Sequence, residues 1–170
     1  DLEEHQKLII NVIRAGLGDP DNEVRKAAAK AFDSLHDALG NSVVDQILPD
    51  LISMLQSEDT AENALAALRQ IMSAKSGVIF PVLIPTLLEP PMTISNAKSL
   101  GALAAVAGSA LVKRLSAVIN ALVDAIVADE DKSVVEESSK ALDTILLSVN
   151  SEGGIHPLMQ HLLSLARSAE

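Results

Sequence analysis

The histidines His156 and His161 are the first residues in this chain whose type and spacing could do chemistry. At about 100° per residue, five positions place two side chains roughly 140° apart around a helix. A zinc site built on one helix needs its ligands on one face, as in the His-Glu-x-x-His pattern. That pattern is missing, and the chain has no cysteine to complete such a site. The two histidines therefore predict no metal centre.

Two acidic turns have the oxygen-rich composition of calcium loops, one with Asp19 and Asp21 and the other with Asp129 and Asp131. An EF-hand loop requires Gly at its sixth position and Glu at its twelfth. In both turns those positions hold valine and lysine instead: Val24, Lys30, Val134 and Lys140. We expect no calcium site. We expect the aspartates to accept hydrogen bonds from the unpaired N–H groups at the start of the following helix.

The glycines Gly101 and Gly108 lie in an Ala-rich segment, SLGALAAVAGSA, that lacks the Lys-Ser or Lys-Thr of a phosphate-binding loop. Each glycine costs a helix about 1 kcal/mol relative to alanine, so close packing of a neighbouring helix is the expected compensation. The chain also shows no nucleophile elbow and no pair of inward-facing carboxylates. These patterns predict a protein that is not an enzyme and that uses no cofactor.

Lys113 and Arg114 are the one basic pair in the middle of the chain, where residues 76–127 carry three basic and two acidic side chains. Two readings stay open for this pair. It is either the solvated start of a helix or a surface contact for a partner. The sequence indicates no other polar residue as a contact for a partner.

The charge distribution argues against direct binding of nucleic acid. The net charge is −10, with seven basic and 13 acidic groups in residues 1–75 and three and eight in residues 128–170. A grip on phosphates needs several Lys or Arg on one face. We therefore expect this chain to contact proteins, or to span between sites, with the low-charge middle as the protein-facing surface.

The ends and the apolar content indicate a soluble segment. No apolar run reaches the 18 or so residues of a membrane span, and the N-terminus DLEEHQ has neither Met nor a basic leader. We expect a piece of a longer soluble chain. The absence of cysteine permits a reducing compartment.

The elements that must position these residues are helices arranged as a repeat. The segment from Gly18 to Gly40 is written again at an offset of 110 residues, where Asp129 matches Asp19. A helical hairpin used repeatedly explains this self-similarity. With only two Phe and neither Trp nor Tyr, the core must consist of many thin aliphatic contacts between helices. The predicted fold class is all-α, an α-solenoid of about four and a half hairpins.

Apolar spacing predicts helices over residues 3–17, 23–39, 43–55 and 112–127, with further helices starting after Thr60, at about Thr93 and at Ser133. Ser133 and Glu136 would form a capping box, and Gly40 a C-cap. In the second helix Val24, Ala28, Ala31, Phe32 and Leu35 are expected to face inward. The predicted units are 3–40, 42–75, 77–110, 111–150 and an incomplete 154–170, whose apolar stripe is left uncovered.

The third unit is expected to be irregular. The last apolar positions of the first helices of the units are spaced by 38, 33, 39 and 38 residues, and the short spacing falls where Pro81, Pro85, Pro90 and Pro91 lie. Because proline removes a backbone hydrogen bond, we expect these residues to shorten or bend that helix.

A period near 38, a proline inside the first helix and the Asp-Pro-Asp…Val-Arg opening of the second helix resemble the HEAT-repeat family. The repeat-type arginine occurs as Arg25, whereas Val135 stands at the matching place of the fourth unit. Any ladder of Asp-to-Arg hydrogen bonds along the array should therefore be interrupted.

Three segments resemble a narrower family, the large fungal translational activators of general amino-acid control: SGVIFPVLIPTLLEPP, SLGALAAVAGSALVKRLSAVINALVDAIV and LLSVNSEGGIHPLMQHLLSLARS. The resemblance implies a non-catalytic, cytoplasmic, ribosome-associated scaffold. Such a scaffold promotes activation of the initiation-factor-two alpha kinase on stalled or collided ribosomes, through the RWD domain of that kinase. It also implies an ABC-type ATPase as a further partner. No residue of the family that contacts the kinase can be matched to a position here.

Other scaffolds stay open as alternatives. A nuclear transport receptor or a phosphatase scaffold would fit the acidity and the repeats equally well. A microtubule-binding array would need basic or aromatic residues on the turns within the hairpins, and here those turns read GDPDN, SEDT, EPPM and ADEDK.

Overall fold

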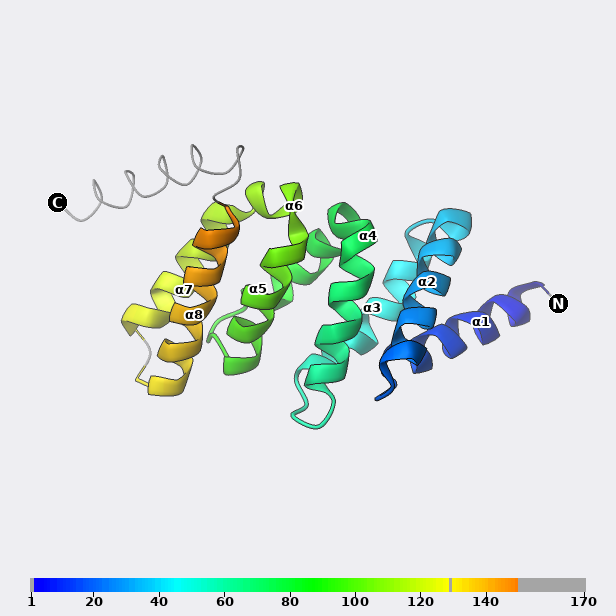
Figure 1. Cartoon of the computed structure of the whole chain (residues 1–170), viewed down its shortest axis with the longest axis horizontal. Coiled ribbons are helices and arrows are strands. Elements are labelled where there is room, and N and C mark those ends of the chain that lie inside the picture. The colour runs from blue at the N-terminus through cyan, green and yellow to red at the C-terminus, as the bar shows by residue number, and fades with distance from the viewer. Residues whose placement is uncertain (1, 129, 150–170) are drawn as a thin grey trace. The chain divides into compact units, whose positions relative to one another are not determined.

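The computed structural model describes residues 2–128 and 130–149, and every regular element in these residues is an α-helix (Figure 1). This confirms the all-α prediction. The helices are α1 (Leu2–Leu17), α2 (Asn22–Leu39), α3 (Ser42–Leu55), α4 (Ala61–Leu87), α5 (Ile94–Ala107), α6 (Ser109–Val112), α7 (Leu115–Ala128) and α8 (Lys132–Ser148).

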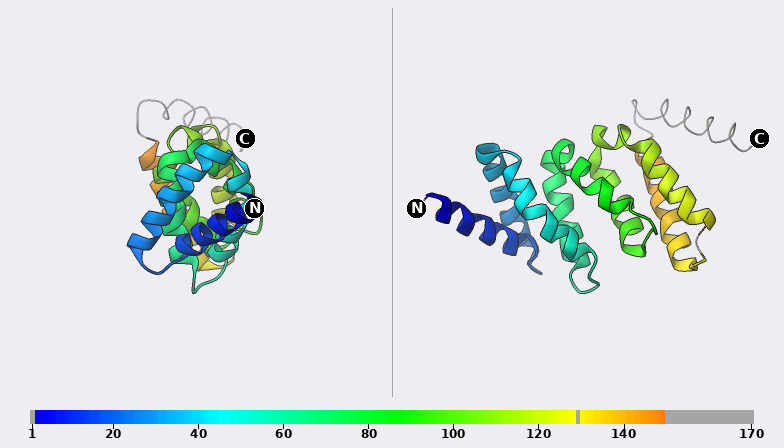
Figure 2. Two further views of the ribbon diagram at one scale, coloured as in Figure 1. Left: turned by 90° about the vertical axis from the view of Figure 1, so that its right-hand side faces the viewer. Right: turned by 180° about the vertical axis from the view of Figure 1, so that it is seen from behind.

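The chain folds as two compact units, Asp1–Leu83 and Ile84–Glu170. In the first unit α1 packs on α2, and both pack on α3 (Figures 1 and 2). In the second unit α7 and α8 form a hairpin, and α8 also packs along α5. The predicted fifth unit, with His156 and His161, lies outside the described residues.

The core of the first unit is almost entirely aliphatic. Leu17 of α1, Leu51 of α3 and Leu68 of α4 are fully buried, together with two aromatic rings, Phe32 of α2 and Phe80 of α4. The Phe32 ring stacks on the imidazole of His36 with centroids 6.4 Å apart. Burial of each such side chain contributes about 1.5–3 kcal/mol relative to exposure.

Helix α1 has two apolar faces rather than one stripe. Ile10, Ile13 and Leu17, spaced by three and four residues, are buried, whereas Leu8, Ile9 and Val12 are 62%, 48% and 70% exposed, respectively. A sequence pattern of period 3.6 cannot decide which of two apolar faces meets a neighbour.

Helix α2 begins and ends at the residues that the sequence indicated. Asp21 is the N-cap, and its carboxylate accepts a hydrogen bond from the Glu23 N–H at 2.8 Å. Gly40, at φ 69°, follows the helix, and its own N–H donates to the His36 carbonyl. The inward prediction is wrong for Val24 and Ala31, which are exposed, because the buried side of α2 is centred on Ala28, Ala29 and Phe32.

The structure corrects the expected position of the irregularity in the third unit. Helix α4 (Ala61–Leu87) consists of two helical stretches joined by a kink at Lys75 (φ −128°, ψ 38°), at the predicted boundary between the second and third units, and Pro81 and Pro85 lie within the second stretch without a residue of non-helical angles. The helix ends before Pro90, as expected for a residue that disfavours helical backbone in front of it.

The kink in α4 coincides with an ion-pair cluster that involves α2. The Lys75 ammonium lies 2.6 Å from Asp37 Oδ1 and 3.4 Å from Asp33 Oδ1. The hydrogen bond from Lys75, followed by its positive charge, holds the pKa of Asp37 below its ordinary value. Lys75 in turn has a raised pKa, chiefly because of the hydrogen bond to Asp37.

Small residues allow close approach of helices in both units. A Cβ on Gly16 of α1 would lie 2.9 Å from Ala28 Cβ on α2. A Cβ on Gly101 of α5 would lie 3.1 Å from Ala141 Cα and 3.3 Å from Ala141 Cβ on α8. Close packing is therefore confirmed for Gly101. It is wrong for Gly108, which has no neighbour within 4 Å of such a Cβ and instead ends α5 at φ 52°.

The starts of the later helices differ in detail from the sequence prediction. Helix α5 starts close to the expected position, and Thr93 is its N-cap, whose hydroxyl accepts from the Asn96 N–H at 3.0 Å. The N-cap of α8 is Asp131 rather than Ser133, and the Asp131 carboxylate accepts from the Ser133 N–H at 2.8 Å. Glu136 does not reach back to form a capping box but pairs with Lys140 at 2.8 Å.

One helix within residues 2–128 and 130–149, α4, is long and apolar enough by length and composition to cross a membrane. The core helix of a soluble protein meets the same criterion. The fully buried Leu68 and Met72 and the nearly fully buried Phe80 fit that reading for α4.

Substitutions at two helical glycines, Gly101 of α5 and Gly77 of α4, should distinguish the effect of close packing on stability from the effect of helix propensity. Gly101→Leu should destabilise the chain by about 1–3 kcal/mol, because the side chain meets the backbone of α8. Gly77→Ala should stabilise it by about 0.5–1 kcal/mol, because nothing lies within 4 Å of a Cβ there and alanine favours the helix. Denaturant unfolding measures both changes, and equal effects of the two substitutions would contradict the packing argument.

The Lys75 cluster should make stability depend on pH in the acid range. Because the pKa of Asp37 is lowered on folding, its contribution is present above the unfolded value of 3.8 and is lost as pH falls through the folded value. Lys75→Met should therefore destabilise the chain at neutral pH, with a difference that shrinks in acid and in high salt. Unfolding of this variant is compared with that of Lys30→Met, an exposed lysine on α2 with no described ion pair. The same pH-dependent loss in both variants would rule the cluster out as the cause.

Candidate protein-interaction surface

The predicted basic pair lies in the turn between α6 and α7. Lys113 and Arg114 are both exposed, and the Arg114 N–H donates to the Leu111 carbonyl at 2.9 Å. Neither side chain forms an ion pair with another described residue. The pair thus directly precedes α7, as in the interpretation of a solvated helix start, and no described carboxylate neutralises its two charges.

The acidic turn before α2 uses its carboxylates for its own backbone. Asp19 Oδ1 accepts from the Asp21 N–H at 2.8 Å, and Asp21 in turn caps the helix. Arg25 Nη1 donates to the carbonyls of Asp19 and Pro20 at 2.8 and 2.7 Å. Arg25 therefore ties the turn to the first coil of α2. In the described ranges, no group of three or more His, Asp or Glu side chains could hold a metal ion.

A shallow hollow in the first unit is occupied by a structural ion pair. Arg14 Nε lies 2.7 Å from Asp50 Oδ2, and another guanidinium nitrogen of Arg14 donates to the Gln46 carbonyl at 3.0 Å. The hollow lies among residues of α1 and α3, including Asn11, Gly18 and Met54. Because Arg14 is already neutralised by Asp50, this place connects the two helices rather than presenting a free charge.

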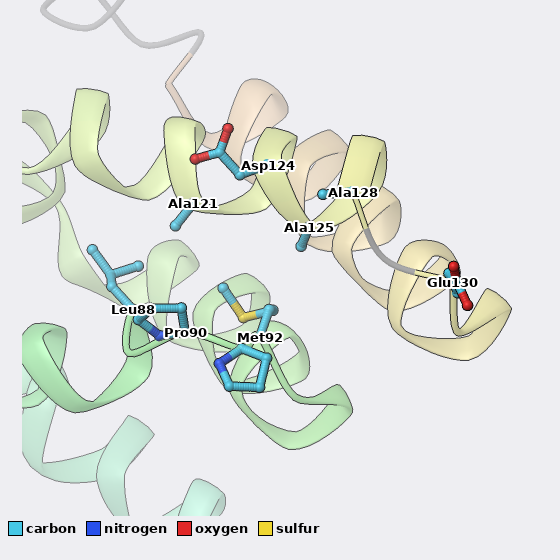
Figure 3. Close-up of a pocket in the computed structure, with 9 residues that line it drawn as sticks. Leu88, Pro90, Met92, Ala121, Asp124, Ala125, Ala128 and Glu130 are labelled. Carbon is cyan, nitrogen blue, oxygen red and sulfur yellow. The ribbon is translucent and has the colours of Figure 1, made fainter.

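A second cavity, of about 450 Å³, opens on the second unit, and we call it the turn groove (Figure 3). One wall is the turn between α4 and α5, formed by Leu88, Pro90, Pro91 and Met92. The other wall is α7 and the turn that follows it, formed by Ala121, Asp124, Ala125, Ala128 and Glu130.

Local sequence explains both walls of the turn groove. The two prolines end α4 at Leu87, and the Asn96 side chain of α5 donates to the Thr86 carbonyl at 3.4 Å, which links the turn to the next helix. On α7, residues spaced by four and three positions share one face, and three such positions hold alanine: Ala121, Ala125 and Ala128. The short methyl side chains leave the space that becomes the groove.

The floor of the turn groove is apolar and its edge is acidic. Ala121 and Ala125 face Leu88 and Met92 across the opening, as Figure 3 shows. Met92 and Ala125 are each 8% exposed, so these parts of the wall are held in place by packing. Asp124 and Glu130 are both exposed, and neither forms an ion pair with another described residue.

Sequence reasoning missed this groove because its walls come from segments about 30 residues apart. The available signals were the Pro-Pro-Met turn and the alanines that repeat along one face of α7. Each signal alone is common in helical proteins, and only folding brings them together.

Comparison with known proteins identifies the family. A family model described as "Stalled ribosome sensor GCN1-like, HEAT repeats" matches residues 79–170, and a general HEAT-repeat model matches residues 9–39. The eIF-2-alpha kinase activator GCN1 of Saccharomyces cerevisiae is 51% identical over 168 residues, which cover 98% of this chain and 6% of that protein.

Animal relatives agree with the fungal one. The stalled ribosome sensor GCN1 of Homo sapiens is 35% identical over 164 residues, which cover 95% of this chain and 6% of the relative. The mouse protein of the same name gives the same identity and coverage. No solved structure matches the chain. The chain thus spans about 6% of the length of these relatives. Because the more specific family model covers over half of its residues, the chain belongs to the GCN1-like family of HEAT-repeat α-solenoid proteins.

Proposed function

We propose that this chain is a non-catalytic scaffold segment of a ribosome-associated protein that promotes activation of the initiation-factor-two alpha kinase during amino-acid starvation. The observation that carries the proposal is the 51% identity, over 98% of the chain, to a protein named as an eIF-2-alpha kinase activator. The name of the animal relatives, stalled ribosome sensor, supports association with stalled or collided ribosomes.

The chemistry of the described residues fits a scaffold. Many charged side chains serve local structure: Asp21 and Asp131 cap helices, Arg25 binds its own turn, and Lys75 joins α4 to α2. A catalytic centre would require polar side chains converging in a pocket. The turn groove has apolar walls with carboxylates at its edge, which suits contact with another protein.

We extend the proposal to the partners implied by the sequence resemblance. These are the RWD domain of the kinase and an ABC-type ATPase, in the cytoplasm. The high identity along the chain favours this role over a nuclear transport receptor or a phosphatase scaffold. The same comparison assigns no contact residue for either partner.

A chimera tests the scaffold role. Residues 1–170 replace the matching segment of the Saccharomyces cerevisiae relative, and phosphorylation of initiation factor two alpha is measured after amino-acid starvation. We expect phosphorylation to be supported by this chimera and by one with Ala105→Asp, because Ala105 is exposed. Ala107→Asp should abolish it, because it places a charge in the core, where Ala107 is fully buried.

The chimera has two outcomes that would contradict the proposal. One is full phosphorylation in a protein from which the whole segment is deleted, since the segment would then be dispensable. The other is loss of phosphorylation in the unsubstituted chimera despite normal folding and expression.

The basic pair provides a separate test of nucleic-acid contact. We expect the 170-residue chain to bind ribosomes only weakly at physiological salt, because two cations release few counterions from RNA. Lys113→Glu with Arg114→Glu should leave co-sedimentation unchanged, as should the matched reversal Lys26→Glu with Lys30→Glu on α2. Tight binding that falls steeply with salt and is lost only in the first variant would show a direct grip on RNA.

A further inference from the structure

The turn groove has the size and wall chemistry of a peptide-docking site. Its volume of about 450 Å³ lies at the lower end of the range of ligand pockets and would hold one or two side chains. Leu88 and Met92 supply flexible apolar atoms on one wall. On the other wall, the alanines of α7 have short side chains that leave space for a ligand (Figure 3). An inserted apolar side chain would therefore meet apolar atoms on both sides.

The charges around the groove restrict what can occupy it. Residues 76–127 contain only two acidic side chains, Glu89 and Asp124. Asp124 lines the groove, and Glu89 directly precedes Pro90 in the opposite wall. Glu130 adds a third carboxylate at the end of α7, and no Lys or Arg lines the groove.

These carboxylates differ from several others in the chain that are held in ion pairs. Asp37 is paired with Lys75, Asp50 with Arg14 and Glu136 with Lys140. Asp124, Glu130 and Glu89 have no ion-pair partner in the part of the chain that the structure describes. No described cation neutralises their negative charge, which attracts basic groups and repels phosphate groups, so it disfavours RNA and acidic lipid surfaces.

We propose that the turn groove docks a short segment of a partner protein in which an apolar side chain is flanked by Lys or Arg. The apolar side chain enters between Met92 and Ala121, and the basic groups lie against Asp124 and Glu130. The inference rests on the proposed scaffold function and adds the chemistry of one partner segment to it.

The binding experiment uses the full 170-residue chain and three labelled short peptides followed by fluorescence anisotropy. One peptide carries a central Leu flanked by Lys and Arg, the second carries the same Leu flanked by Glu, and the third has Ser in place of Leu between Lys and Arg. We expect saturable binding of the first peptide alone, weakened by salt because part of the attraction is between charges.

Two variants, each with a matched control, locate the peptide in the groove. Ala121→Phe fills the groove from α7 and should weaken binding by about tenfold or more. Ala117→Phe adds the same ring one helical turn earlier, at an exposed position outside the groove, and should leave binding unchanged. Asp124→Asn with Glu130→Gln should weaken binding by about two- to fivefold without filling the groove, whereas Asp143→Asn on α8 should not.

Several results would overturn the proposal: no saturable binding of the Leu peptide with basic flanks, equal binding of the acidic-flanked or Ser peptides, or equal effects of the two Phe substitutions. Dimerisation of the chain that Ala121→Phe abolishes would identify a second copy as the occupant and overturn it as well. The double carboxylate variant keeps the test decisive if Ala121→Phe misfolds. Because the assay uses only purified chain and peptides, its failure leaves the starvation assay of the scaffold role unaffected.

Discussion

The rest of this structure depends on close contact between helices that carry small aliphatic side chains. The chain has only two aromatic residues, so cohesion must come from many short-range contacts instead of a few large rings. Gly16 against Ala28 in the first unit and Gly101 against Ala141 in the second allow two helix backbones to approach each other. Contacts between neighbouring helices are how a repeat array gains stability.

Charge in this chain has two different roles. Carboxylates at helix starts and in ion pairs, such as Asp21 and Asp37, are used to fix the backbone or to join two helices. Those around the turn groove have no such partner among the described residues. The distinction depends on position rather than on residue type, since the same Asp and Glu side chains serve both roles. A net charge of −10 therefore says less about binding than the location of individual carboxylates.

The irregular helix α4 illustrates how a repeat array accommodates local differences. Proline at positions 81 and 85 is tolerated within helical backbone, while the change of direction occurs at Lys75, where the ammonium group reaches two carboxylates of α2. A proline removes one hydrogen-bond donor, whereas a residue with non-helical angles redirects the chain. The element Ala61–Leu87 is thereby divided into two helical stretches at Lys75.

The amino-acid sequence by itself determined the all-α class, the HEAT-repeat family and most helix ends, because apolar period, caps and terminating residues act over a few positions. Asp21, Gly40 and Thr93 were predictable for that reason. Only the tertiary structure decided which face of α1 is buried, that Gly108 ends a helix instead of packing, and that the Leu88–Met92 turn and the alanines of α7 enclose a groove. These features depend on contacts between segments distant in sequence, and no local pattern encodes which neighbour a helix will meet.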